Sequence, residues 1–286
     1  MISRNLRSGA LLFTAIICLS FLVKYSFLLS EKENDAEENA EKIYAILSDN
    51  FDQTEKILNS VGRKIVENSP NLEPKAIHKI FVETPNINGY NNIFSWSLFD
   101  WVDIDGFQTV NSMLGIRKNP PQIGLERNYL NHGTESWKIT FSNGVFGNTS
   151  EIYVIPAGVR IESKSHQRLG AVAVGIDVKK LTTVIESRLD KDISFLLIDQ
   201  RSNQVTCGPR DSDKHFGKIF NRMPESLDGK NYVYEKRMDP KYPYKIWVGY
   251  DKKEFWREVY YSSLLLAIQI IGVGACASFL IRNSEE

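Results

Sequence analysis

The sequence predicts an α+β fold: a long N-terminal helix packs on an antiparallel sheet, and a membrane-spanning helix lies at each end of the chain. Three observations predict it. Apolar residues gather in two runs near the chain ends, residues 9–29 and 259–281. Residues 31–69 carry apolar side chains at helical spacing. After about residue 93 the spacing changes to the two-residue period of strands.

The two terminal runs have the length of membrane helices. Residues 9–29 contain one charge, Lys24, and residues 259–281 contain none. A helix of about 20 apolar residues spans a hydrocarbon core of roughly 30 Å, and Lys24 lies where its stem can reach the interface. The alternative for the first run is a signal peptide, but the run is long for one and lacks a small-x-small cleavage site before Glu31. The alternative for the second is a buried core helix.

The distribution of charge around the runs predicts their orientation. Arg4 and Arg7 precede the first run, Arg282 follows the second, and acidic residues crowd positions 31–38. Basic residues favour the cytoplasmic side. We therefore expect both ends of the chain in the cytoplasm, two passes through a membrane, and residues from about 30 to 258 on its outer side.

The segment 31–69 is predicted to be one long helix that ends at Asn68-Ser69-Pro70. Its apolar seam has a period of 3.5 residues. The seam consists of Tyr44, Leu47, Phe51, Thr54, Leu58, Val61 and Ile65. Two compatible interpretations are open: the seam packs on the core of its own chain, or it also joins two copies in a homodimer.

The rest of the segment between the two apolar runs is predicted to form short strands with turns between them. Asp105-Gly106 is a hairpin signal between strands at 93–102 and 107–110. Further strands are expected at 139–141, 152–155, 169–178, 193–199, 232–237 and 244–250, with helices at 126–131 and 178–188. The predicted segments are a cytoplasmic N-terminus (1–8), a first span (9–29), a long helix (31–69), a membrane-distal unit (70–190), a smaller membrane-proximal unit (191–255), a second span (259–281) and a cytoplasmic tail (282–286). We expect no output domain in so short a tail.

Composition and motifs exclude several functions. The net charge is zero, which gives no reason to expect a nucleic-acid partner. Cys207 is the one cysteine between the apolar runs, and the four histidines are scattered, so no disulfide, metal site or cofactor is predicted. The fragment DIDG does not make a calcium loop, because Trp101 stands where the first oxygen ligand belongs. Hydrolase and kinase motifs are absent from the sequence, so we expect no enzyme.

Four stretches resemble the Cache family of bacterial extracytoplasmic sensors, in its double, PAS-like form. They are the hairpin FDWVDIDG (99–106), the pocket pair RNY (127–129), the strand GAVAVGIDV (170–178) and the closing strand YKIWVGY (244–250). The resemblance covers about residues 35–255. It implies a long helix with a PAS-like antiparallel sheet, flanked by two transmembrane helices as in chemoreceptors and sensor kinases, and a small ligand in the membrane-distal unit.

The resemblance also implies site residues. Arg127 matches the arginine that holds a carboxylate in the amino-acid-binding branch, and Asp177 matches the aspartate that meets the amino group. The remaining candidates are Tyr129, Trp137 and Tyr153 as aromatic walls, with Trp101 and Asp103 from the hairpin motif. A guanidinium binds a carboxylate with two hydrogen bonds, so the chemistry of Arg127 suits the carboxylate-binding role that the resemblance implies. His132 is a further candidate for the pocket wall.

Alternatives remain open for these residues. Arg127 and Asp177 can instead form a structural salt bridge or stand apart on the surface, and Asp103 can be a turn residue. Leu130 stands where that branch often has a second aromatic, and residues 137–147 match poorly. A dicarboxylate or another small anion is as compatible with the pattern as an amino acid.

Two functions from different classes follow. The first is a membrane-anchored sensor that binds a small ligand and signals through a separate partner, such as a kinase or cyclase. The second is a structural or protein-interaction membrane protein with a degenerate sensor fold. An extracytoplasmic hydrolase is a third class, for which the sequence offers no motif.

Overall fold

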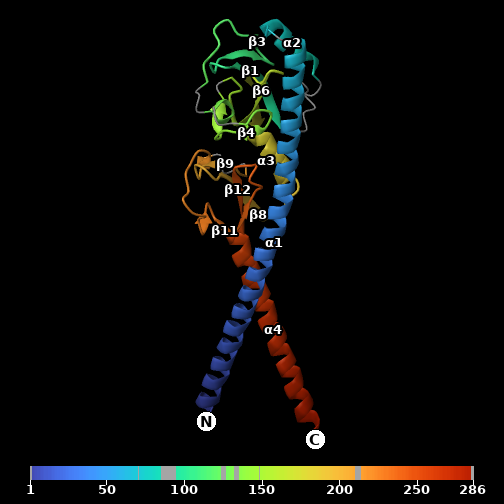
Figure 1. Ribbon diagram of the computed structural model, residues 1–286. Helices are drawn as coiled ribbons and strands as arrows, with labels where there is room; N and C mark the ends of the chain where they lie inside the picture. Colours follow the sequence, from blue (N-terminus) through green and yellow to red (C-terminus); the bar gives the residue numbers. More distant parts are fainter. Residues whose placement is uncertain are drawn as a thin grey trace.

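The computed structural model describes residues 2–69, 71–84, 95–123, 127–131, 135–147, 149–209 and 214–284. The molecule is long and narrow: α1 (Ile2–Asn68) runs its whole length, two sheets lie along the upper part of α1, and α4 (Lys252–Ser284) crosses α1 below them (Figure 1). The first apolar run and the predicted helix 31–69 are thus parts of one continuous helix.

The seam of α1 is buried in the core of its own chain. Phe51, Leu58, Val61 and Ile65 are fully buried, and Phe51 packs against Phe141 with 4.7 Å between ring centroids. The core-packing interpretation of the seam is confirmed. Because both sheets cover the seam, pairing of two copies along this stripe is not available to the folded chain.

The membrane-distal sheet is antiparallel and has the strand order β3-β2-β1-β7-β6-β4, with β5 paired to β6. Its strands are β1 (Trp96–Asp103), β2 (Gln108–Asn111), β3 (Gly115–Ile116), β4 (Ile139–Phe141), β5 (Val145–Gly147), β6 (Ile152–Glu162) and β7 (Arg168–Asp177). A short helix that the sequence pattern did not predict, α2 (Pro74–Glu83), begins with proline and packs Ile77 and Phe81 into the core.

The hairpin between β1 and β2 forms where the Asp105-Gly106 signal predicts it. Gly106 has a φ of 85°, a conformation that suits glycine. The Asp103 carboxylate accepts hydrogen bonds from the backbone N–H groups of Asp105 (3.0 Å) and Phe107 (2.8 Å). Asp103 therefore holds the turn in place, which is one of the two roles that the sequence left open for it.

The second sheet lies nearer to the crossing of α1 and α4 (Figure 1). Its order is β10-β11-β12-β8-β9. The strands are β8 (Ile193–Asp199), β9 (Val205–Cys207), β10 (Ser226–Leu227), β11 (Lys230–Arg237) and β12 (Tyr244–Asp251), and α3 (Val178–Glu186) leads into the sheet from β7. Since α4 follows β12 without a break, this sheet is joined directly to the second apolar helix.

Two of the predicted elements differ clearly in type or length from the observed ones. Where a helix was expected at 126–131, the described residues form one 3-10 turn, η1 (Asn128–Leu130). The strand expected at 152–155 continues to Glu162, because Val159 and Ile161 extend the alternation into the core. Ile93 and Phe94, expected to begin the first strand, lie outside the described residues.

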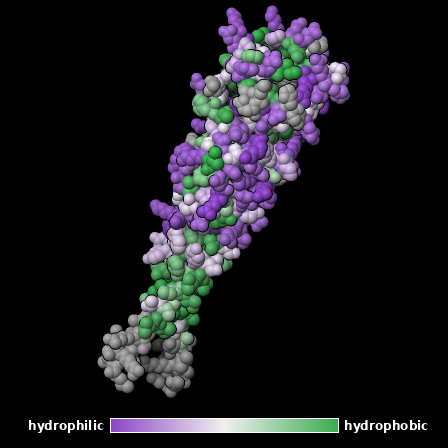
Figure 2. Space-filling model, turned by 60° about the vertical axis from the view of Figure 1, so that its left-hand side comes forward, coloured by the Kyte–Doolittle hydropathy of each residue, from purple (hydrophilic) through white to green (hydrophobic). Residues whose placement is uncertain are grey.

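Both α1 and α4 contain a stretch that is long and apolar enough, by length and composition, to cross a membrane. The apolar surface of both helices gathers at the end of the molecule away from the sheets (Figure 2). The helices meet through aromatic side chains: Tyr25 lies 5.6 Å from Trp256 and 5.8 Å from Phe255, between ring centroids. Lys32, about two turns along α1 from Tyr25, donates a 2.6 Å hydrogen bond to Asp192, the residue before β8.

Candidate ligand-binding site

The two faces of the membrane-distal sheet are built from side chains of different size. On β7 the larger Val172, Val174 and Ile176 belong to the core that packs on α1, whereas Ala171 and Ala173 belong to the opposite face. Side chains of a strand alternate between faces, so the alternation of valine with alanine or glycine produces this difference. The small residues leave a cavity of about 540 Å³ on the outer face of the sheet.

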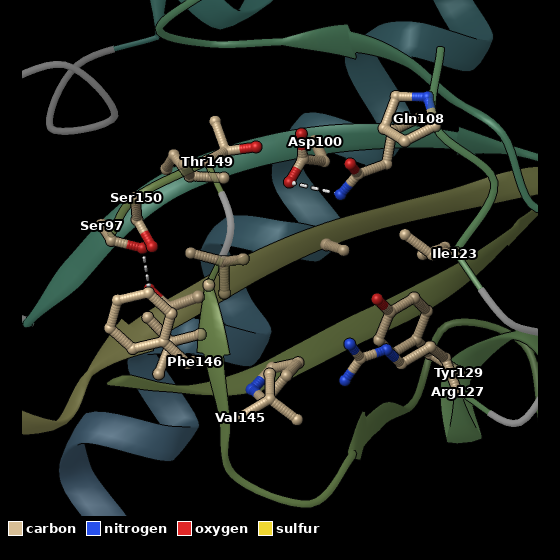
Figure 3. Close-up of a pocket in the computed structure, with 18 of the residues that line it drawn as sticks. Ser97, Asp100, Gln108, Ile123, Arg127, Tyr129, Val145, Phe146, Thr149 and Ser150 are labelled. Carbon is tan, nitrogen blue, oxygen red and sulfur yellow. Dashed lines mark hydrogen bonds between the residues drawn. The ribbon is translucent and has the colours of Figure 1, made fainter. Parts of the chain in front are cut away.

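Polar side chains from several elements converge on this cavity (Figure 3). Its lining includes Ser97, Asp100, Gln108, Arg117, Arg127, Tyr129, Thr149 and Ser150, and Ala173, Gly175, Val154 and Pro156 form part of the apolar wall. A concave site with a few convergent polar groups on an apolar floor is typical of small-molecule binding.

Asp100 supplies the acidic group of the cavity. It is only 5% exposed, and its carboxylate accepts hydrogen bonds from the side-chain amides of Asn111 (2.7 Å) and Gln108 (3.2 Å). The Asn111 amide oxygen is itself occupied by the backbone N–H groups of Met113 and Leu114, which directs its NH₂ group at Asp100. Burial raises the pKa of the Asp100 carboxyl to about 6, although Asn111 and the positive charge of Arg117 oppose that rise.

Arg127 and Tyr129 reach the cavity from the segment around η1. The Arg127 carbonyl accepts a 2.8 Å hydrogen bond from Leu130, and the Asn128 amide donates to the Phe141 carbonyl, which anchors the segment to β4. The Tyr129 ring lies on Gly158 of β6, where a Cβ atom would approach the ring to 2.5 Å. Burial raises the pKa of Tyr129, so its hydroxyl keeps its proton and can donate.

Arg117 is the second arginine of the lining. Its Nη2 donates a 3.0 Å hydrogen bond to the Thr149 hydroxyl. Its Nε is buried and has no hydrogen-bond partner among the described residues. A buried N–H without a partner is costly, and it is available to an acceptor on a bound molecule.

Two of the seven candidate residues, Arg127 and Tyr129, line the cavity. Trp101 lies elsewhere: it is 2% exposed and belongs to the core that faces α1, because odd and even residues of β1 point to opposite faces of the sheet. Asp103 closes the hairpin turn and does not line the cavity.

The other three candidates also lie outside the cavity lining. Trp137 lines a separate, open hollow of about 340 Å³ beside α1. The Tyr153 ring stacks on Phe216, which belongs to the segment after β9, with centroids 4.9 Å apart. Asp177 caps α3, accepting a 3.1 Å hydrogen bond from the Lys180 backbone N–H, and is absent from the cavity lining.

The salt-bridge alternative and the His132 candidate remain to be placed. Arg127 and Asp177 form no ion pair with each other within the described ranges, so the salt-bridge alternative has no support. His132, a candidate for the pocket wall, lies outside the described residues.

The sequence pattern missed Asp100, Gln108 and Arg117. A signal for Asp100 was present: a carboxylate stands between Phe99 and Trp101, within the otherwise apolar run LFDWV (98–102). Such a residue lies on the face opposite the two aromatic rings, and it therefore marks the polar face of the sheet. Arg117 and Gln108 stand in a hairpin of ordinary composition, which offered no comparable signal.

Comparison with known proteins adds the fold class. No family model matches the chain, and no curated protein matches it either. Solved structures do match. The extracellular domain of a protein assigned as a histidine kinase, rpHK1S-Z16, has a TM-score of 0.61 at 14% identity, covering 79% of this chain and 97% of that one.

Two chemoreceptor domains are similar to the same extent. The ligand-binding domain of Pseudomonas fluorescens CtaA, solved with L-serine, has a TM-score of 0.60 at 14% identity and covers 78% of this chain and 99% of its own. That of Pseudomonas aeruginosa PctB, solved with L-glutamine, has a TM-score of 0.58 at 12% identity, with coverage of 77% and 91%. The chain therefore has the fold of Cache-type extracellular ligand-binding domains, as the resemblance predicted.

Proposed function

We propose that this protein is a membrane-anchored sensor, without catalytic activity of its own, whose membrane-distal cavity binds a small carboxylate-bearing ligand through Arg127. One observation carries the proposal: Arg127 lines the cavity and its guanidinium has no hydrogen-bond or ion-pair partner within the described residues, while Tyr129 lies in the same wall. A guanidinium without a partner is matched to a carboxylate, which it binds with two parallel hydrogen bonds.

The size of the cavity and the structural neighbours support the same proposal. About 540 Å³ lies within the range of small-molecule sites. The neighbouring domains whose ligands are named were solved with amino acids. An amino acid is therefore one candidate within the proposed class of carboxylate-bearing ligands.

Hydrogen bonds connect the η1 segment to the second sheet. The Asn128 side-chain amide, next to Arg127, donates to the Phe141 carbonyl, and Arg201 in the turn after β8 donates to the same oxygen at 3.0 Å. Arg201 is also paired with the fully buried Asp199 at the end of β8. A ligand that moves the η1 segment would shift this shared carbonyl, the second sheet and, through β12, helix α4 relative to α1.

We propose that the signal passes to a separate partner protein, a kinase or a cyclase. We propose a homodimer through helix 31–69 that uses its polar, solvent-facing side, since the seam is buried. The basic residues at Arg4, Arg7 and Arg282 support cytoplasmic termini and a periplasmic sensor region in a bacterial inner membrane.

The experiment that tests ligand binding uses the full chain in lipid nanodiscs and a library of amino acids and small organic acids. We expect at least one compound to raise the melting temperature and to give a saturable isotherm. Arg127→Gln should abolish the shift, because it removes the charge but keeps much of the volume. Arg188→Gln is the matched control, since Arg188 is exposed at the end of α3, away from the cavity.

A folded wild-type chain that binds no compound would contradict the sensor proposal and favour the interaction protein with a degenerate sensor fold. Equal binding by wild type and Arg127→Gln would contradict the assigned residue.

Orientation is tested by labelling in cells. Ser165 is exposed at the tip of the β6–β7 hairpin, whereas the native Cys207 is buried. A membrane-impermeant maleimide should label Ser165→Cys from the periplasm without disruption of the inner membrane. Labelling only after lysis would contradict the orientation.

A further inference from the structure

The cavity contains one acidic and two basic side chains among its described lining residues, and they are not paired with each other. Asp100 forms no ion pair in the described part of the chain, and Arg127 has none either. Figure 3 shows Asp100 and Gln108 on one side of the cavity and Arg127 with Tyr129 on another. A cavity with separate, unpaired charges of both signs complements a ligand that carries both signs.

The hydrogen bonds of Asp100 leave room for a ligand. Among the described residues each carboxylate oxygen accepts one hydrogen bond, from Asn111 or from Gln108, whereas an ionised carboxylate offers about four acceptor sites. The amides hold the side chain in one orientation, because the Asn111 oxygen is fixed by the turn at Met113 and Leu114. The acidic group is thus positioned before any ligand arrives, which lowers the cost of binding.

The aspartates that end β7 and β1 already have structural partners. Asp177 caps α3 and Asp103 caps the hairpin turn, and neither lines the cavity. Asp100 caps neither a helix nor a turn: its carboxylate accepts the side-chain amides of Asn111 and Gln108, and its burial, only partly offset by the charge of Arg117, raises its pKa and is unfavourable for the ionised form. Groups that are kept at such a cost in a cleft are characteristic of functional sites.

We propose that Asp100 is the specificity-determining residue of the cavity: it receives a cationic amino group of the ligand while Arg127 holds the carboxylate. The inference rests on the proposed function and narrows its ligand class to amino-carboxylate zwitterions. It also reassigns the role that the sequence pattern gave to Asp177.

The test uses pairs of compounds that differ at the amino group: L-alanine with L-lactate, L-aspartate with L-malate, L-phenylalanine with L-phenyllactate, and 4-aminobutyrate with butyrate. Affinities are measured by calorimetry on the full chain in nanodiscs. We expect the binding compounds to be the amino members, each at least about tenfold tighter than its partner, the range expected for a hydrogen bond between charged groups.

Three variants assign the preference to a residue. Asp100→Asn should weaken the amino member at least about tenfold and leave its partner unchanged, so the preference collapses. Asp100→Glu keeps the charge and should retain a preference, and it keeps the test valid if the asparagine variant folds poorly. Asp177→Asn should leave the preference unchanged.

Four results overturn the inference, and they are distinguishable. Tight binding of a lactate, malate or phenyllactate without preference for its amino partner overturns it, and the sensor proposal stands. The same holds if Asp100→Asn keeps the preference, or if Asp177→Asn loses it. If no member of any pair binds the folded wild-type chain, the zwitterion assignment fails, and the sensor proposal then depends on the wider library.

Discussion

The two sheets pack one face on the same α1 core but use their other faces differently. In the membrane-proximal sheet, the outer face carries Leu196, Ile198 and Trp247, and these are covered by Phe216 and Phe220 from the segment after β9. In the distal sheet, the outer face carries Ala173, Gly175 and Asp100, and a cavity lies above them. The comparison teaches that side-chain volume on the outer face decides whether such a sheet is covered by packed side chains or leaves a cavity.

The largest effect is expected where the outer face is filled. Trp247 is fully buried and donates a 2.7 Å hydrogen bond to Glu235. Truncation of a buried tryptophan costs about 3–5 kcal/mol. Trp247→Ala should therefore lower the free energy of unfolding by about this amount, measured by denaturant titration of the full chain, without weakening ligand binding in samples that remain folded. A loss below about 1 kcal/mol would show that this face is not a packed core.

The converse change fills the open face. Ala173→Leu places a large apolar side chain in the cavity, as in the proximal sheet, and should reduce affinity for any ligand at least about tenfold with little loss of stability. Ala157→Leu is the matched control, because Ala157 is fully buried on the core face of β6 and overpacking there costs about 1–3 kcal/mol. If Ala173→Leu binds ligand normally, the cavity is not the binding site.

A third prediction concerns the charge that the open face carries. Because the folded-state pKa of Asp100 is raised to about 6 from 3.8, the folded chain binds a proton more tightly than the unfolded chain between these values. Stability should fall as pH rises from about 4 to 6, by at most about 3 kcal/mol for a difference of about two pH units.

Asp100→Asn should remove this component from the pH profile of the melting temperature, measured without ligand. The proximal outer face, which is apolar, contributes no such component. If the profile of Asp100→Asn parallels that of the wild type from pH 4 to 7, the raised pKa of Asp100 is contradicted.

The smallest effect is expected at the polar attachment of the proximal sheet to α1. Lys241 lies 2.7 Å from Asp52 and 2.6 Å from Glu55, and Glu55 also accepts a 3.0 Å hydrogen bond from the Ile139 backbone N–H in β4. Lys241 is 39% exposed, so solvent weakens these ion pairs. Lys241→Gln should cost about 1 kcal/mol or less, and less still at high salt, with exposed Lys253→Gln as control. A loss that salt does not reduce would argue for a packing role.

Much of the fold was predictable because it follows from periodicity. The seam through Phe51 and Leu58, the hairpin at Asp105-Gly106 and the strands at 139–141 and 193–199 all appear where local patterns place them. Local patterns could not distinguish a membrane helix followed by a second helix from one unbroken α1. They also missed α2, whose short apolar pattern depends on contact with α1 and β2 for its stability.

The candidate site was predictable only in part, because it depends on which strand faces meet. Arg127 and Tyr129 were identified through a short motif, and both line the cavity. Asp177 matched a motif equally well, yet its carboxylate serves the first turn of α3. Asp100 and Arg117 come together only after β1 and β3 pair in register with β2, and that register is set by the three-dimensional fold.

The central claim, that the open face of the distal sheet is the ligand site, is tested most directly by hydrogen–deuterium exchange of the full chain in nanodiscs. A ligand found in the library should slow exchange in β1 and in residues 127–131, with no direct protection of residues 215–223 over the proximal sheet. Protection confined to residues 215–223, or none in β1 at saturating ligand, would contradict the account.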